Sequence, residues 1–450
     1  MEKLKLNDQI QLEIHGLGHS GEGVGNYHGY TIFVDGALPG ELVKVSLTEC
    51  RKTYGRAELI QIITPSPDRV VPICPVFEKC GGCQLMHLKY SQQLLIKQKR
   101  VLDALQRIGK IANAPVEPCL ASPKELHYRN KIQLPVQSGL DGVKIGLYAR
   151  SSHDLVEVDT CYIHCELGEE IYQKVRAIIK QSGLSAYDAQ TGEGELRHIL
   201  IKSSVNLKEV LVILVTAKQV SPILSDVAKQ IKQSSPYIKG VIHNINPSNS
   251  NVILGSSFHP LIGNKSIQEQ MGDLKFNISA ASFFQVNTQQ AERLYAKALE
   301  FAEVNERQIV LDAYCGVGTI SLFFARQVRS VIGIECVPAA IEDAKENAIL
   351  NGISNTSFVC ANAEDYIKSL KEIDVMILNP PRKGCEKSFL DGIKRLHPNR
   401  IVYISCDPAT LARDLAFLCA MGYTLDTVQP YDMFPQTAHV ECVAKLTKTR

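Results

Sequence analysis

The last third of the chain alternates between short apolar runs and amphipathic stretches. The apolar runs predict strands at Ile309–Asp312, Ser330–Glu335, Ser357–Cys360, Asp374–Asn379 and Ile401–Cys406. Helical patterns follow them near residues 318–327, 337–351, 386–396 and 408–420. This alternation is typical of a parallel sheet with helices on both faces. We therefore predict an α/β fold with a doubly wound sheet over residues 274–450.

The first 63 residues show a different pattern, in which short alternating stretches are separated by glycine-rich turns. Strands are predicted at Gln9–Ile14, Thr31–Val34, Glu41–Leu47 and Arg56–Ile63. Residues 1–63 therefore predict a small β-barrel of the oligonucleotide-binding kind. The stretch TPSPDRVVPICP follows as a linker, because proline disfavours regular structure before and at itself. Residues 64–273 mix strands and helices and predict a central α/β domain.

Composition bounds the class of protein. With 450 residues, 45% hydrophobic and 21% charged, the chain is long enough for several cores, which excludes a disordered protein or a small disulfide scaffold. The formal net charge is only +2, so a nucleic-acid partner must be held by local patches. Between Lys79 and Lys131, ten Lys/Arg stand against three Asp/Glu. This surplus suits phosphates and equally suits a solvated helix face.

Apolar stretches of signal-peptide or membrane-spanning length are absent from the sequence. We therefore expect no membrane partner and a cytoplasmic location. The sequence gives no oligomeric state, and a monomer is the default expectation. Fourteen cysteines without an export signal indicate reduced thiols, and clustered thiols indicate metal binding or catalysis.

A glycine-rich turn follows the first predicted parallel strand in IVLDAYCGVGTISLFF. Gly316 and Gly318 permit a tight turn and close approach of a ligand. Glu335 ends the next strand, 23 residues after Asp312, where a carboxylate can accept hydrogen bonds from ribose hydroxyls. At this point both a dinucleotide and S-adenosylmethionine fit.

Polar residues also end the remaining strands of this sheet. Asn362, Asn379 and Cys406 follow strands three, four and five, and Arg382 lies close by in the chain. Because Cys406 precedes Asp-Pro and a helix, we expect the helix N-terminus to lower the pKa of its thiol. Glu441 begins the final strand and is a candidate general base. A solvated charge at a strand end is the plainer interpretation of Glu441.

A cluster of cysteines precedes the central domain. Cys74, Cys80 and Cys83 form C-x5-C-x2-C, and a fourth ligand is needed from Cys161, Cys165 or Cys119. Four thiolates suit an iron–sulfur cluster or structural zinc. The uneven spacing lacks paired C-x2-C knuckles, which disfavours a ribbon-type zinc site.

Taken together, these segments resemble the RNA uracil-5-methyltransferases that use S-adenosylmethionine, nearly from end to end. GHSGEGVGNYHGYTIFVDGALPGE resembles that family's N-terminal TRAM domain. The segments HYRNK, KIGLYARSSHDLVEVDTC, TGEGELRHIL, SFFQVN, DAYCGVGTISL, NPPRKG, ISCDP and HVECV are similar to its signature segments and stand in the same order.

The resemblance implies a role for individual residues. Cys406 is the nucleophile that adds to carbon 6 of uracil, and Glu441 removes the proton from carbon 5. The residues implied in methyl-donor binding are Gln285, Tyr314, Thr319, Glu335, Asn362 and Asn379. Cys74, Cys80, Cys83 and Cys161 match the ligands of a 4Fe-4S cluster in the cluster-bearing branch. The implied partner is RNA, with ribosomal RNA favoured over transfer RNA.

One residue departs from the family pattern, since Asn379 stands where the family has aspartate. The change alters hydrogen bonding between the methyl donor and the uracil. Two alternatives therefore stand beside the uridine enzyme. One is an RNA-binding or assembly factor with weakened catalysis, and the other is a methyltransferase acting on another base.

Overall fold

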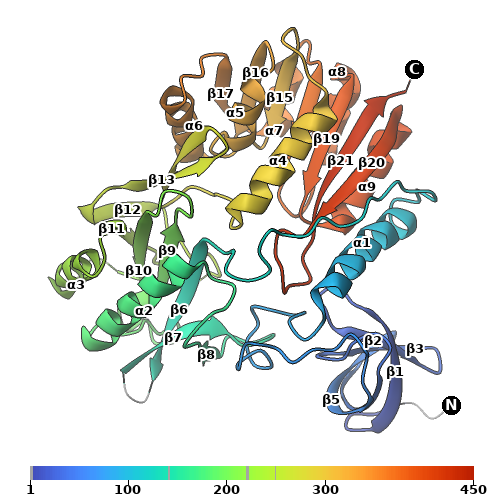
Figure 1. The fold of residues 1–450 in the computed structure, drawn as a ribbon, viewed down its shortest axis with the longest axis vertical. Coiled ribbons are helices and arrows are strands. Elements are labelled where there is room, and N and C mark those ends of the chain that lie inside the picture. Colours follow the sequence, from blue (N-terminus) through green and yellow to red (C-terminus); the bar gives the residue numbers. More distant parts are fainter. Residues whose placement is uncertain (1–3, 140–141, 219–221, 249, 450) are drawn as a thin grey trace.

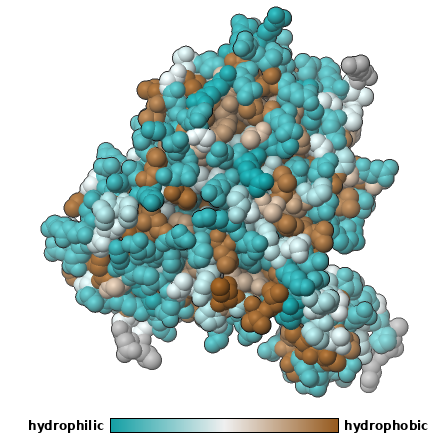
Figure 2. All heavy atoms as spheres, viewed as in Figure 1, coloured by the Kyte–Doolittle hydropathy of each residue, from teal (hydrophilic) through white to brown (hydrophobic). Residues whose placement is uncertain are grey.

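The computed structural model describes residues 4–139, 142–218, 222–248 and 250–449. Figure 1 shows the C-terminal sheet at the top, a central sheet below it and a small barrel at the lower right. The described part of the chain thus contains the predicted barrel, central sheet and C-terminal α/β sheet, which confirms the predicted fold class. On the face drawn in Figure 2, hydrophilic residues cover most of the surface and hydrophobic residues form small groups.

Five N-terminal strands close into a barrel in the order β1-β2-β3-β5-β4. Its interior is filled by aliphatic side chains such as Leu12, Ile32 and Val45, all essentially buried. The sequence analysis missed β2, because GVGNY belongs to a glycine-rich stretch that also has the composition of a turn. The strands are β1 (Gln9–Leu17), β2 (Gly23–Tyr27), β3 (Tyr30–Val34), β4 (Leu42–Cys50) and β5 (Tyr54–Thr64).

The central region forms a seven-stranded sheet in the order β12-β11-β10-β9-β6-β7-β8. Only the pair β10–β11 is parallel among its named pairs, and helices α2 and α3 pack on the sheet. The elements are β6 (Lys131–Gly139), β7 (Gly142–Tyr148), β8 (Leu155–Glu157), α2 (Glu166–Gln181), β9 (Leu196–Ser203), β10 (Val210–Thr216), α3 (Pro222–Gln233), β11 (Ile238–Ile245) and β12 (Ser257–Gly263).

The C-terminal region forms a second seven-stranded sheet in the order β17-β16-β15-β18-β19-β21-β20. Strands β15 to β19 are parallel, and β21 is antiparallel to both β19 and β20. The strands are β15 (Ile309–Ala313), β16 (Ser330–Glu335), β17 (Thr356–Cys360), β18 (Val375–Leu378), β19 (Arg400–Ser405), β20 (Tyr423–Tyr431) and β21 (Glu441–Lys448).

Helices cover both faces of this sheet, as the alternating pattern predicts. One hydrophobic core lies under α4, α5 and α6, and a second lies under α8 and α9. The helices are α4 (Thr288–Ala302), α5 (Thr319–Ala325), α6 (Pro338–Leu350), α7 (Ala363–Tyr366), α8 (Lys387–Leu396) and α9 (Pro408–Ala420), and a 3-10 turn, Ile367–Ser369, follows α7.

Two elements connect the regions. Helix α1 (Tyr90–Arg107) packs on α9, and its Val101 and Leu105 belong to the second core of the C-terminal sheet. Figure 1 shows α1 between the barrel and this sheet. The hairpin β13 (Ser266–Met271)–β14 (Leu274–Ser279) packs against α6. None of the helices in the described residues has the length and hydrophobicity needed to cross a bilayer.

Candidate active site

Five of the proposed site residues lie at one edge of the C-terminal sheet. Tyr314, Glu335 and Asn379 directly follow or end β15, β16 and β18, Asn362 comes two residues after β17, and Cys406 directly follows β19. Because the five strands are parallel neighbours, their carboxyl ends share this edge, where ligands of such sheets bind.

The turn between β15 and α5 adopts the left-handed conformation that the glycines permit. Tyr314, Gly316 and Gly318 have φ of 65°, 54° and 78°. A Cβ atom at position 318 would lie 2.9 Å from Cζ of Phe358, so both backbone angle and space require glycine there. Thr319 begins α5 directly after this turn and is buried.

Glu335 connects the turn to the end of β16. Its Oε2 accepts a hydrogen bond from the Gly316 amide at 3.3 Å, and its Oε1 accepts from the amides of Cys336 (2.8 Å) and Val337 (3.0 Å). The carboxylate is therefore fixed beside the glycine turn and remains half-buried at the sheet edge. This is the placement that a ribose-binding carboxylate needs.

Tyr314 and Gln285 are held by residues that the sequence analysis did not single out. The Tyr314 hydroxyl donates to Oε1 of Glu364 at 3.1 Å. The Gln285 carbonyl accepts from Nδ2 of Asn130 at 3.0 Å. Nothing in the sequence around Glu364 marks it, since it stands on a four-residue helix, whereas Asn130 lies within HYRNK.

The two asparagines differ in exposure. Asn362 is exposed and caps α7 through its backbone, since its carbonyl accepts from the amides of Asp365 and Tyr366. Asn379 is half-buried next to the buried end of β18. Asn379 therefore lies deeper in the edge than Asn362.

Cys406 and Glu441 lie at the same end of two paired strands. Ser405 of β19 is opposite Cys442 of β21, so the residues one step further, Cys406 and Glu441, are neighbours across the pair. Cys406 is half-buried, and Glu441 is only 4% exposed. The plainer interpretation of Glu441 as a solvated strand-end charge is therefore wrong.

The electrostatics of this pair differ from the sequence expectation. Burial raises the pKa of Glu441 to about 8, and Arg382 opposes the shift. Burial, Glu441 and Asp407 raise the pKa of Cys406 to about 11, again opposed by Arg382. The expected lowering of the Cys406 pKa was wrong, because burial raises this pKa most. In addition, Asp407 already caps α9 by accepting from the Ala409 and Thr410 amides and adds a negative charge.

The chemical consequence is that both shifts favour the protonated forms of Cys406 and Glu441 in the free protein. Removal of these protons is favoured by alkaline pH or by added positive charge. Arg382 is the cation that lowers both pKa values, and its side chain is exposed.

Four of the predicted cluster cysteines line one cavity. Cys74, Cys80, Cys83 and Cys161 surround it together with apolar side chains such as Phe77 and Met86. Four thiols around one cavity are the donor set of an iron–sulfur cluster. The described residues contain no group of three or more His, Cys, Asp or Glu side chains that is arranged to hold a metal ion.

The other two candidate ligands lie elsewhere. Cys165 is buried and packs against Gly168, and Cys119 belongs to the core of the C-terminal sheet. Arg150 stabilises the loop of residues 74–83, because its guanidinium donates to the carbonyls of Phe77 and Cys83 at 3.1 Å. The four cysteines that line the cavity are the four that the resemblance implies.

The chain is similar to known proteins over nearly its whole length. The sequence pattern of the family described as tRNA (Uracil-5-)-methyltransferase matches residues 89–449, and the TRAM domain pattern matches residues 3–60. Uncharacterized RNA methyltransferases of Halalkalibacterium halodurans and Clostridium acetobutylicum are 43% and 42% identical to the chain. These alignments cover 98% and 100% of this chain and 97% and 99% of the relatives.

A solved structure is similar over the whole chain. It is the tRNA (uracil-54, C5)-methyltransferase of Pyrococcus abyssi in complex with S-adenosyl-L-homocysteine, with a TM-score of 0.78 and 30% identity. The match covers 97% of this chain and 99% of that one.

Proposed function

The chain belongs to the family of RNA uracil-5-methyltransferases, and on this premise we propose that it methylates a uridine in RNA through a covalent adduct on Cys406. The observation that carries this proposal is the pairing of Cys406 with buried Glu441 at the edge that also holds Glu335 and the glycine turn. S-adenosylmethionine supplies an electrophilic methyl group when bound at this edge.

Cys406 carries the first step. Carbon 5 of uracil is a poor nucleophile, so the Cys406 thiol loses its proton to solvent and its sulfur bonds to carbon 6. The electron pair of the carbon 5–carbon 6 bond then forms an enolate, and carbon 5 gains the density needed to accept the methyl group. Cys406 reaches the ring only when the base is out of the helical stack, so the target must be flipped or unpaired.

Glu441 carries the second step. Its carboxylate takes the proton from carbon 5, the double bond between carbons 5 and 6 returns, and the sulfur of Cys406 leaves. The raised pKa of Glu441 makes it a stronger base once it is ionised.

The methyl donor is assigned to the glycine turn and the neighbouring strand ends. Glu335 would accept hydrogen bonds from the ribose of the donor, and Tyr314, Thr319 and Gln285 are assigned to the same binding site. Asn362 and Asn379 complete the boundary toward the base, where Asn379 offers an amide in place of a carboxylate.

We propose that the chain has three domains with different functions, residues 1–63, 64–273 and 274–450. The barrel and the basic surface of residues 79–131 hold the RNA, and the C-terminal sheet performs the chemistry. Lys97 is an exception within the basic stretch, because it is buried in an ion pair. Exposed cations of that stretch, such as Arg107, Lys110 and Lys124, remain available to phosphates.

Ribosomal RNA is the first candidate substrate, as expected from the sequence. Transfer RNA is the second, because the solved relative from Pyrococcus abyssi is described as acting on transfer RNA. Nucleoside mapping of both RNA pools from cells with and without the gene decides between them. We expect one or more 5-methyluridines to disappear from ribosomal RNA in the deletion strain, while loss from transfer RNA alone favours the second candidate. An unchanged 5-methyluridine content in both pools contradicts the proposed activity.

A 4Fe-4S cluster bound by Cys74, Cys80, Cys83 and Cys161 is proposed as a structural tie between the 74–83 loop and the segment that follows β8. The four thiols around one cavity support it. We expect Cys161→Ser to remove the visible absorbance and iron of the purified protein and to lower its thermal stability and its affinity for RNA. Cys165→Ser is the matched control and should retain the iron. Normal iron content in Cys161→Ser contradicts the ligand assignment, and unchanged stability and RNA affinity contradict the structural role.

A further inference from the structure

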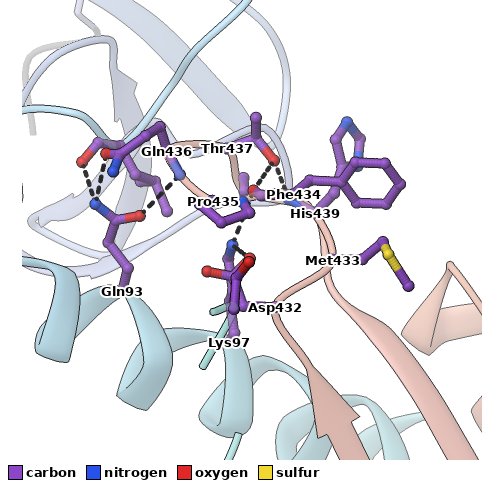
Figure 3. Close-up of polar contacts among 12 residues, drawn as sticks. Gln93, Lys97, Asp432, Met433, Phe434, Pro435, Gln436, Thr437 and His439 are labelled. Carbon is purple, nitrogen blue, oxygen red and sulfur yellow. Dashed lines mark hydrogen bonds and ion pairs between the residues drawn. The ribbon is translucent and has the colours of Figure 1, made fainter. Parts of the chain in front are cut away.

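The buried ion pair of Lys97 lies outside the residues proposed for catalysis and donor binding. Nζ of Lys97 on α1 lies 2.5 Å from Oδ1 of Asp432 and donates to the carbonyl of Phe434 at 3.2 Å. The two charged side chains are 1% and 0% exposed. Figure 3 shows Lys97 pointing from α1 into the chain segment that follows β20.

A pair of glutamine side chains reinforces this contact one turn earlier on α1. Nε2 of Gln93 donates to Oε1 of Gln436 at 3.0 Å, and the backbone N–H of Gln436 donates to Oε1 of Gln93 at 3.1 Å. Gln93 is fixed in turn, because Nε2 also donates to the carbonyls of Leu85 and Leu88. Gln436 has a φ of 69°, a conformation that persists only when its surroundings determine it.

Further contacts hold the rest of the segment. The Gln436 carbonyl accepts from the amides of Gln84 and Leu85 at 3.0 and 2.9 Å. Arg100 of α1 donates to the carbonyl of Ala438 at 2.5 Å, and the Tyr128 hydroxyl donates to that of Pro435 at 3.1 Å. The residues between Asp432 and Val440, here called the 432–440 segment, are therefore restrained along most of their length.

These contacts matter for the proposed reaction because of where the 432–440 segment lies in the chain. The segment leads directly into Glu441, the first residue of β21. A carboxylate that removes a proton must be placed within about 3 Å of the carbon it deprotonates, and a misplacement of about 1 Å can cost on the order of 10²-fold in rate. The contacts from α1 thus act on the residue whose placement the proposed second step requires.

We propose that α1 is a positioning element for the proton-removal step, with Lys97–Asp432 and Gln93–Gln436 holding the 432–440 segment so that Glu441 faces carbon 5 of the methylated uracil. This inference rests on the proposed function and assigns positioning roles to Lys97, Gln93, Asp432 and Gln436. A buried ion pair is often no more stabilising than apolar residues of similar volume, so fold stability alone gives little reason for this pair.

The two steps of the reaction separate a positioning role from a general loss of stability. If Glu441 is misplaced, Cys406 still adds to carbon 6 and the methyl group is still transferred. The carbon 5 proton then leaves slowly, so a covalent protein–RNA adduct accumulates after one equivalent of S-adenosylhomocysteine has formed. A partly unfolded enzyme loses both steps in proportion and accumulates no adduct.

The experiment compares Lys97→Met and Gln93→Met with the wild-type full-length protein in single-turnover reactions with its RNA. We expect methyl transfer to fall only a few-fold, product release to slow by about tenfold to a hundredfold, and the denaturation-resistant adduct to accumulate. Gln93→Met leaves no unpaired buried charge, so it tests the proposal even if Lys97→Met fails to fold. Lys97→Arg should restore part of the release rate.

Arg400→Met is the matched control, because it removes the cation of another partly buried ion pair, Arg400–Glu303, at the opposite end of β19 from Cys406. We expect no adduct with this variant. Proportional slowing of both steps in Gln93→Met, or unchanged release, overturns the positioning role. If the wild-type protein itself forms no S-adenosylhomocysteine with any RNA, the proposed function fails instead.

Discussion

Replacing Cys406 by alanine is expected to abolish methylation of uridine while the protein still binds S-adenosylmethionine. No other thiol ends a strand beside Glu441 in the described residues, so nothing can replace the covalent step. Loss of a residue that forms the covalent intermediate lowers turnover by an amount on the order of 10⁴-fold or more. The donor contacts proposed for Glu335 and the glycine turn are independent of the sulfur.

Tritium release from RNA labelled at carbon 5 of uridine measures this loss, and equilibrium dialysis measures donor binding. RNA containing 5-fluorouridine adds a second readout, because fluorine cannot leave as a proton and the wild-type protein should remain covalently bound. Cys419→Ala, a half-buried cysteine on α9, is the control and should behave as wild type. Tritium release at the normal rate by Cys406→Ala would contradict the covalent mechanism.

Replacing Glu441 by glutamine is expected to stop the reaction after methyl transfer. Glutamine keeps the size of the side chain and cannot accept the proton from carbon 5, so release should slow by about 10²–10⁴-fold. A covalent adduct of protein and methylated RNA should accumulate and survive denaturation. Turnover by Glu441→Gln at the wild-type rate would show that another group is the base.

The pH dependence of release follows from the pKa of Glu441, which burial raises to about 8. Only the ionised carboxylate accepts the proton, so the single-turnover release rate of the wild-type enzyme should rise with pH and level off above about 8. The Glu441→Gln variant should lack this rise. Asp426→Asn, an exposed change on the neighbouring strand β20, is the control and should keep it.

The same raised pKa links the base to stability. A carboxyl group whose pKa is higher in the folded protein than in the unfolded chain favours folding at low pH, and this contribution is lost as pH rises through the folded value. The contribution of Glu441 to the stability of the free protein therefore falls as pH rises from its ordinary pKa of 4.5 to about 8, and it does not fall further at higher pH. The active site keeps a buried group that is poorly solvated when charged, which is the usual cost of a strong base at a functional site.

Much of the fold could be predicted because its signals are local. The parallel strands β15 to β19 are apolar runs bounded by turns and helices, and polar residues such as Glu335 and Cys406 fall at their ends. The glycine turn is equally local, since positive φ at Gly316 and Gly318 restricts which residues can stand there. Resemblance of ordered segments added the roles of Cys406, Glu441 and the four cysteines as predictions.

Features that depend on distant parts of the chain were missed or wrongly predicted. The strand β2 is defined by pairing with β1 and β3, and its glycine-rich sequence gives no independent strand signal. The pKa of Cys406 depends on burial and on Asp407, Glu441 and Arg382 around it. Lys97 belongs to a basic stretch in the sequence, yet its charge is paired with Asp432, 335 residues away.

The sequence by itself determined the alternation of strands and helices and the glycine turn and gave the candidates for the reactive side chains, because each of these signals depends on neighbours within a few residues. Only the tertiary structure decided how far Glu441 is buried, which cations and anions surround Cys406, and that α1 contacts the 432–440 segment. These properties arise when remote segments exclude water from the same space, and burial and charge pairing have no counterpart in the order of residues along the chain.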